Sequence, residues 1–149
     1  MPLYPLLLTP IYKEKVWGGR ALERFSRPLP GGPDLKIGES WELADLAATS
    51  PSGGGGEAAH SVVRNGPLRK RTLGEVIREF GTIVTGTMKL AADGSFPLLL
   101  KYLDARENLS VQVHPSEAYA AKHPGAHLKS EAWYVVAADP GATIYRGVV

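Results

Sequence analysis

The stretch that decides the fold reads Leu109-Ser110-Val111-Gln112-Val113-His114-Pro115. Apolar and polar residues alternate along it, which is the pattern of a β-strand with one apolar and one polar face. Successive side chains of a strand point to opposite faces, so Ser110, Gln112 and His114 share the polar face. An apolar core does not tolerate three unpaired polar side chains. We therefore expect this face to line a site.

A second strand-like stretch further along the chain reads Lys129-Ser130-Glu131-Ala132-Trp133-Tyr134-Val135-Val136. Lys129 and Glu131 are two residues apart, so they share a face if the strand begins at Lys129. If the two strands are neighbours, Glu131 lies beside Gln112 and His114. One nitrogen and two oxygen ligands suit a divalent metal of the zinc or manganese type. The alternative is that His114 is an ordinary surface or hydrogen-bonded histidine.

The composition excludes several classes of protein. A chain of 149 residues is one domain, residues 1–149, or a piece of a larger one. Its 17 basic and 15 acidic residues give a net charge of +2, which argues against nucleic-acid binding. It contains no cysteine, so any metal must use histidine, carboxylate or amide ligands. His123 and His127 lie in polar sequence, and we interpret both as surface histidines.

The amino terminus does not resemble a targeting segment. Residues 1–10 are apolar but contain three prolines and no basic residues, which is a poor signal peptide. No apolar run approaches the length of a membrane span, so no membrane partner is expected. The sequence predicts a cytoplasmic protein.

The remaining elements predict a mainly β domain with a helical insertion, an α+β fold. Residues 37–44 have strand character, and the apolar run 96–103 predicts a strand covered on both faces. A capping box at Thr72 and Glu75 begins a helix over 73–84. A short helix after Ser116 and a strand from residue 142 are also predicted. Turns at close intervals favour a jelly-roll barrel of short strands. The polar strand face fits the interior of such a barrel, open at one end.

Two carboxylates in the strand over 37–44 are further candidates for a site. Glu39 and Glu42 lie near its middle, among apolar residues. The alternative is that one is solvated and the other pairs with an arginine. We favour this alternative for Glu39.

Four segments, in order, resemble the type I mannose-6-phosphate isomerases (phosphomannose isomerases), which are cupin-fold zinc enzymes. They are Lys15-Val16-Trp17-Gly18-Gly19, Ile37-Gly38-Glu39-Ser40-Trp41-Glu42, the region from Pro97 through Gln112-Val113-His114-Pro115, and Lys129-Ser130-Glu131-Ala132-Trp133-Tyr134. The resemblance spans nearly the whole chain. The Gln-x-His-Pro and Lys-x-Glu motifs together are far more specific than either alone.

The resemblance implies an aldose–ketose isomerase that interconverts mannose 6-phosphate and fructose 6-phosphate. It implies one zinc ion held by Gln112, His114 and Glu131. It places Lys129 at the substrate as a catalytic residue, and Ser110 in the wall of the same pocket. The expected partner is therefore a small sugar phosphate, and the oligomeric state is open.

The sequence departs from the family at its end. The family completes its zinc site with a histidine further downstream and places a catalytic arginine later still, whereas this sequence ends at Val149. We therefore expect an incomplete cupin-like barrel whose zinc site lacks its last ligand, with weakened metal binding and little or no activity from the chain alone. The alternative function is a non-catalytic cupin-like module with residual metal or sugar-phosphate binding. A different metallocupin, such as a dioxygenase, is a weaker alternative because those sites use more histidines.

Overall fold

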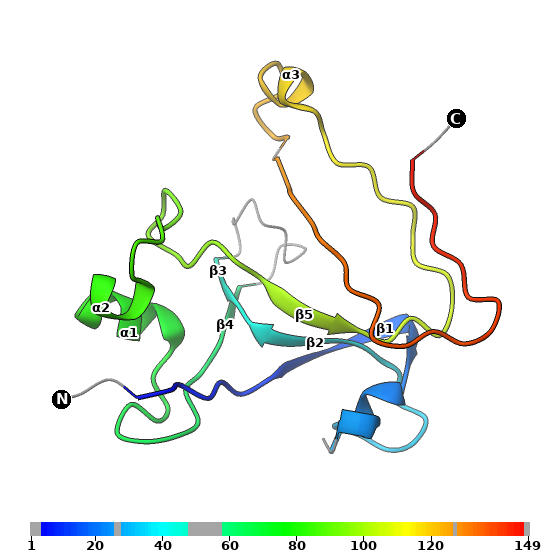
Figure 1. Cartoon of the computed structure of the whole chain (residues 1–149), viewed down its shortest axis with the longest axis horizontal. Coiled ribbons are helices and arrows are strands. Elements are labelled where there is room, and N and C mark those ends of the chain that lie inside the picture. Colours follow the sequence, from blue (N-terminus) through cyan, green and yellow to red (C-terminus); the bar gives the residue numbers. More distant parts are fainter. Residues whose placement is uncertain (1–3, 26–27, 48–57, 127, 148–149) are drawn as a thin grey trace.

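The computed structural model describes residues 4–25, 28–47, 58–126 and 128–147. Over these ranges the chain is mainly β, with few and short helices, as predicted (Figure 1). The strands are β1 (Ile11–Gly19), β2 (Ile37–Leu43), β3 (Asp45–Leu46), β4 (Ala59–His60) and β5 (Leu100–Leu103). The helices are the 3-10 helix η1 (Ala21–Phe25) and the α-helices α1 (Leu73–Phe80), α2 (Thr82–Thr85) and α3 (Glu117–Ala120).

The larger sheet has the strand order β1-β2-β5, and both neighbouring pairs are antiparallel. The strand predicted from residue 37 is the central strand β2. The apolar run over 96–103 forms a strand only from Leu100 onward. The prediction that this strand is covered on both faces is wrong, because Leu100 is 55% exposed. β5 lies at one edge of the described sheet, which leaves its outer side open.

Strands β1 and β2 approach each other closely where both carry glycine. A Cβ atom on Gly18 would lie 2.4 Å from the backbone nitrogen of Gly38. A Cβ atom on Gly38 would lie 2.5 Å from the Cβ atom of Lys15. Both distances are too short for any real side chain, so this crossing requires glycine.

The buried apolar residues form separate small clusters. One lies around Trp41 and the β3–β4 hairpin, a second around Ile37 and η1, and a third around Val63 and α1. Each cluster joins segments that are distant in the sequence, and burial of their apolar area is the main stabilising term.

Helix α1 begins where the capping box predicts. The Thr72 hydroxyl accepts from the Glu75 backbone N–H at 3.2 Å, and the Glu75 carboxylate accepts from the Thr72 backbone N–H at 2.7 Å. The predicted continuation to residue 84 is interrupted at Gly81, whose φ of 54° separates α1 from α2. No helix in the described ranges is long and apolar enough to cross a membrane.

Three of the predicted strands do not form as strands. Residues 109–113, 131–136 and 142–147 run as extended segments that project from the sheet (Figure 1). A β-strand needs a neighbour for its backbone hydrogen bonds. In the described part of the chain, the backbones of 108–115 and 128–138 form no such bonds with one another or with the sheet. The sequence correctly predicted an extended backbone in these segments, but a local pattern does not provide a partner strand.

Candidate metal centre

Three of the predicted site residues converge between two extended segments. Helix α3 turns the chain back on itself, and Ser116 caps it by accepting from the Tyr119 backbone N–H at 3.2 Å. The turn brings His114 to Glu131, with 2.9 Å between His114 Nε2 and Glu131 Oε2. Lys129 Nζ lies 2.5 Å from the other oxygen, Glu131 Oε1. The two oxygens of one carboxylate therefore contact one imidazole and one ammonium group.

The hydrogen bonds to Glu131 lower the pKa of its carboxyl and keep it ionised. The hydrogen bond from Lys129 is the largest cause, and with the hydrogen bond from His114 it lowers the pKa of Glu131 from 4.5 to about 2. Desolvation acts in the opposite direction but is outweighed. At neutral pH the group is a carboxylate, the form that binds a metal ion.

The partner of His114 also determines its tautomer. An ionised carboxylate only accepts hydrogen bonds, so His114 Nε2 carries a proton in this contact. A metal ion bound between the two side chains would take the place of that shared proton. The site as it stands is thus a closed hydrogen-bonded cluster of His114, Lys129 and Glu131.

Gln112 and Ser110 lie on the same extended segment as His114 and contact each other. Gln112 Nε2 donates to Ser110 Oγ at 3.5 Å, a long and weak bond, and both residues are exposed. Their contact matches the predicted sharing of one face. Within the described residues, however, no three histidine, aspartate or glutamate side chains lie close enough together to hold a metal ion. A third ligand beside His114 and Glu131 would therefore have to be another type of side chain, such as the amide of Gln112.

Glu39 is neither solvated nor paired with an arginine, so the favoured interpretation of this residue is wrong. It is 7% exposed and accepts from Trp41 Nε1 at 2.6 Å and from Lys101 Nζ at 3.2 Å. Trp41 lies two residues along the same strand, β2, whereas Lys101 comes from the neighbouring strand β5, where it lies opposite Trp41. The other carboxylate of β2, Glu42, accepts from the Ser40 hydroxyl at 2.5 Å.

The sequence analysis did not identify Lys101 as the partner of Glu39, although the sequence contains an indication of this role. A lysine inside the apolar run 96–103 requires a buried acidic partner, and Glu39 is that partner. This partly buried ion pair places two charged side chains in the sheet, which composition and alternation did not reveal.

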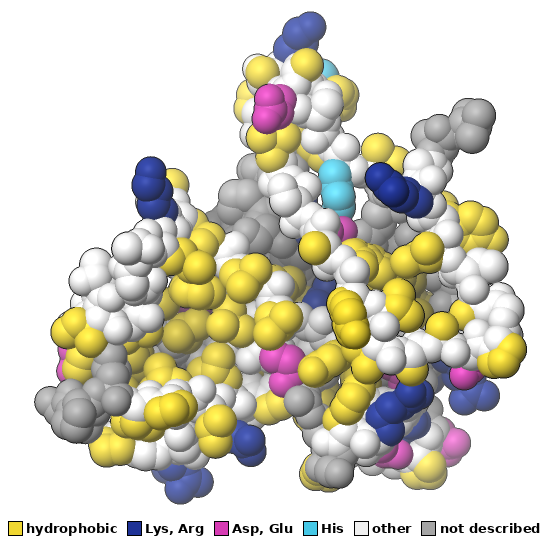
Figure 2. All heavy atoms as spheres, viewed as in Figure 1, with side chains coloured by type: hydrophobic (Ala, Val, Ile, Leu, Met, Phe, Trp, Pro, Cys, Tyr) yellow, Lys and Arg dark blue, Asp and Glu magenta, His cyan; other side chains and the backbone are white. Residues whose placement is uncertain are grey.

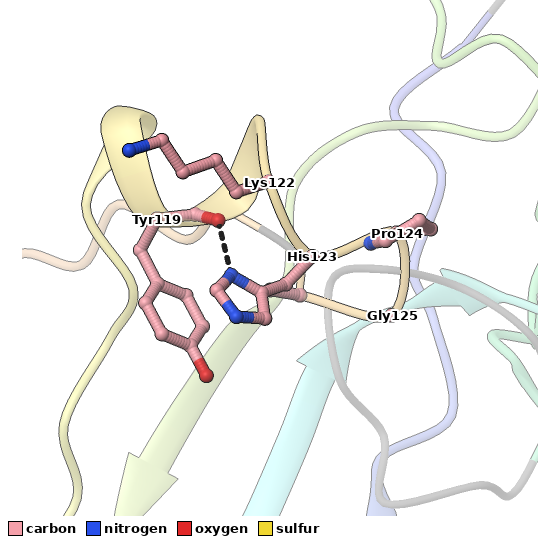
Figure 3. Close-up of a pocket in the computed structure, with 6 residues that line it drawn as sticks. Tyr119, Lys122, His123, Pro124 and Gly125 are labelled. Atoms are coloured by element: carbon pink, nitrogen blue, oxygen red, sulfur yellow. Dashed lines mark hydrogen bonds between the residues drawn. The ribbon is translucent and has the colours of Figure 1, made fainter.

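Two surface pockets lie apart from the contact of His114 with Glu131. One of about 420 Å³ is formed at α3 by residues that include Tyr119, Lys122 and His123 (Figure 3). There the His123 ring stacks on Tyr119 with centroids 3.8 Å apart, and His123 Nδ1 donates to the Tyr119 carbonyl at 2.8 Å. His123 is exposed, as expected of a surface histidine, whereas His127 lies outside the described residues.

The second pocket, of about 380 Å³, is lined by residues of β3, β4 and α1, including Asp45, His60 and Arg78. His60 Nδ1 lies 2.9 Å from the buried Asp45 carboxylate. The other Asp45 oxygen accepts from the Phe96 backbone N–H at 3.0 Å. One carboxylate oxygen therefore joins β3 to β4, and the other joins this strand pair to the segment before β5.

Comparison with known proteins identifies the family. Residues 6–141 match the phosphomannose isomerase type I catalytic domain, so the chain belongs to that family. It is 36% identical to mannose-6-phosphate isomerase ManA of Bacillus subtilis over 148 residues, which is 99% of the chain. It is 39% identical to a mannose-6-phosphate isomerase of Streptococcus mutans over 144 residues, which is 96% of the chain.

The structural comparison agrees. The crystal structure of a mannose 6-phosphate isomerase from Bacillus subtilis superposes with a TM-score of 0.60 at 36% sequence identity, over 80% of this chain. The match covers 33% of that crystallised chain, and the sequence matches cover 42% of ManA and 40% of the streptococcal protein. The chain thus spans about 40% of the length of its curated relatives.

Proposed function

We propose that this chain carries the zinc-binding part of an aldose–ketose isomerase that interconverts mannose 6-phosphate and fructose 6-phosphate. The observation that carries the proposal is the cluster of His114, Lys129 and Glu131, found in a chain of the phosphomannose isomerase family. An imidazole nitrogen and a carboxylate oxygen 2.9 Å apart are donors of the types that zinc prefers.

The donor set fits one zinc ion. His114 and Glu131 would be ligands, and the amide oxygen of Gln112 would be the third. Three protein ligands with an open fourth position are typical of catalytic zinc. Bound zinc supplies a Lewis acid that polarises a sugar carbonyl and stabilises the enediolate charge developing on its oxygen.

Lys129 has two roles in this proposal. Its ammonium group neutralises Glu131, and it adds a positive charge beside the position that a sugar carbonyl would occupy. A lysine so placed can also help to move a proton. The Ser110 hydroxyl, on the same segment as His114, would hydrogen-bond to the sugar phosphate.

The fold proposed for the functional unit is the cupin-like jelly-roll barrel that the sequence predicted, with residues 1–149 as part of one domain. The mainly β architecture and the likeness to a mannose 6-phosphate isomerase structure support it. The cytoplasmic location and the absence of nucleic-acid and membrane partners remain predictions from the sequence.

A second candidate function is a non-catalytic module that binds a metal ion or a sugar phosphate. It is favoured by one observation, namely that the segments bearing His114 and Glu131 are extended and lack partner strands in the described residues. Zinc binding with no turnover would support this second candidate.

The two candidates are separated by measuring zinc content and isomerase turnover on the same samples. We expect His114→Ala and Glu131→Ala each to lose bound zinc, and His123→Ala to retain it as the matched histidine control. Zinc-dependent turnover that disappears in the first two variants establishes the isomerase. Zinc retained in full by both variants would contradict the proposed site.

A further inference from the structure

The pocket of about 380 Å³ beside β3, β4 and α1 has a polar lining that the proposed function does not use. We call it the Asp45 pocket, after its buried carboxylate. Its walls are the strand pair β3–β4, helix α1 with its N-cap, and the turn over residues 93–95. Its volume lies in the range of small-molecule sites. None of its lining residues belongs to the segments that carry His114 and Glu131, so it is a separate site.

The walls of the Asp45 pocket are joined through Asp45 itself. The Asp45 side chain is 4% exposed, and one of its oxygens lies 2.9 Å from His60 Nδ1. Its other oxygen accepts from the Phe96 backbone N–H at 3.0 Å. A Cβ atom on Gly74 would lie 3.0 Å from Asp45 Oδ1, so α1 packs against the same carboxylate. These contacts hold the three walls in place without a ligand.

Each wall also presents a polar group that no other described residue uses. The Asp45 carboxylate accepts the proton of His60 Nδ1, so Nε2 of the neutral ring is a free acceptor. Asp93 uses only its Oδ1, which accepts from the Ser95 backbone N–H and hydroxyl at 3.0 and 2.6 Å, so its Oδ2 is a second free acceptor. The Arg78 guanidinium has no hydrogen bond or ion pair with any described residue, and it carries several donors.

The charges of the lining favour a neutral ligand. Both oxygens of Asp45 already accept hydrogen bonds, so the charges left for a ligand are those of Arg78 and Asp93, one of each sign. Asp93 stays ionised, because the hydrogen bonds from Ser95 lower the pKa of its carboxyl. An anion would therefore meet a carboxylate, and a cation would meet a guanidinium. A sugar hydroxyl both donates and accepts, so it can bind all three free groups.

This polar lining is a local feature of the molecule. Hydrophobic side chains cover much of the face seen in Figure 2, and most of the Lys and Arg side chains in that view lie at its margins. Donors and acceptors that gather in one pocket are typical of a ligand site, in which a few polar groups fix the orientation of the ligand.

We propose that the Asp45 pocket binds a neutral polyhydroxylated ligand, of the class of an uncharged pyranose. The Arg78 guanidinium donates to hydroxyl oxygens of this ligand, and His60 Nε2 and Asp93 Oδ2 accept from its hydroxyl groups. The proposal requires neither zinc nor isomerase chemistry. At the ligand efficiency of ordinary small molecules, a ligand of about 13 non-hydrogen atoms binds with a Kd on the order of 1 mM.

The test is an NMR titration of the nitrogen-15-labelled, metal-free chain with methyl α-D-glucopyranoside. This probe is uncharged, and its locked ring prevents aldose–ketose isomerisation. We expect saturable shifts of the amides at 60, 74, 78 and 93–95, with a Kd on the order of 1 mM. The amides at 109–114 and 129–131 should not move. Glucose 6-phosphate and L-serine, an anion and a zwitterion, should bind the pocket more weakly than the glucoside.

Two variants remove one free group each. Arg78→Met removes the donors of an exposed side chain and keeps its unbranched stem. Asp93→Asn keeps an oxygen acceptor for Ser95 but replaces the second acceptor by a donor. Each should weaken binding of the glucoside by at least about tenfold, as expected for a hydrogen bond to a charged group. Arg69→Met is the matched control, because Arg69 is exposed and does not line the pocket.

The outcomes that would overturn the proposal are distinct. One is the absence of shifts at the pocket amides when the glucoside is present at about ten times the expected Kd. Another is tighter binding of glucose 6-phosphate or L-serine, and a third is a loss in Arg69→Met equal to that in Arg78→Met. Shifts confined to 109–114 and 129–131 would place the sugar at the candidate metal centre instead. None of these results depends on the zinc content of the His114 and Glu131 variants, so this proposal and the proposed function fail separately.

Discussion

Replacing Lys129 by methionine should raise the pKa of Glu131. The hydrogen bond from Lys129, at 2.5 Å, is the largest of the causes that lower this pKa from 4.5 to about 2. Methionine keeps an unbranched apolar chain of similar length but removes the charge and the donor. We therefore expect the titration midpoint of the Glu131 carboxyl to rise from about 2 toward 4.5.

The energy behind this shift is modest. At roughly 1.4 kcal/mol per pH unit, a pKa drop from 4.5 to about 2 corresponds to about 3 kcal/mol before screening. Since 27% of the Glu131 side chain is exposed, solvent screening reduces this to on the order of 1 kcal/mol. The folded-state pKa is depressed, so the contribution is complete above pH 4.5 and is lost as the pH falls toward 2.

The assay is a carbon-detected NMR titration of the Glu131 carboxyl in the metal-free chain. His114→Ala should give a smaller rise than Lys129→Met, because the bond from His114 is the second cause. Lys122→Met removes an exposed lysine at α3 and should leave the midpoint near 2. A midpoint that stays near 2 in Lys129→Met, or that rises more in His114→Ala, would refute the reasoning.

Three further predictions concern the scaffold. Asp45→Ala removes the acceptor of His60 and of the Phe96 backbone N–H, and should cost about 1–3 kcal/mol in urea unfolding, more than His60→Ala. Ile37→Ala, at a position 1% exposed, should cost about 2–5 kcal/mol, against about 0.5–1.5 kcal/mol for Ile37→Val, in the same assay. The hydrogen bond from the Thr72 backbone lowers the pKa of Glu75 below 4.5, so the capping box should stabilise α1 above that pH and weaken as the pH falls below it. Far-UV circular dichroism should show this loss in the natural chain, and a Glu75→Gln variant should lack it.

Features that depend on neighbours in the chain could be predicted from the sequence. The start of α1 is one such feature, because its capping box is closed by two residues three positions apart. The ion pair of Lys129 with Glu131 is another, since residues two apart on an extended backbone share a face. The Ser116 cap of α3 follows the same principle.

Tertiary structure decided whatever depends on residues far apart in the sequence. Glu39 is buried because β5 brings Lys101 to it across 62 positions, and no local pattern encodes that pairing. The contact of His114 with Glu131 likewise depends on the turn at α3, which the two motifs do not specify.

The extended segments at 109–113 and 131–136 show the same division between local and distant causes. Alternation at 109–113 indicates an extended backbone, and so do the aromatic and β-branched residues of 131–136, because both signals are local properties of the sequence. A strand exists only when a second backbone completes its hydrogen bonds, and this is a property of two segments rather than one. The sequence thus determined the candidate metal-ligating side chains of the proposed site and the family of the chain. Only the tertiary structure decided which of these side chains come into contact and which backbone segments have a partner strand.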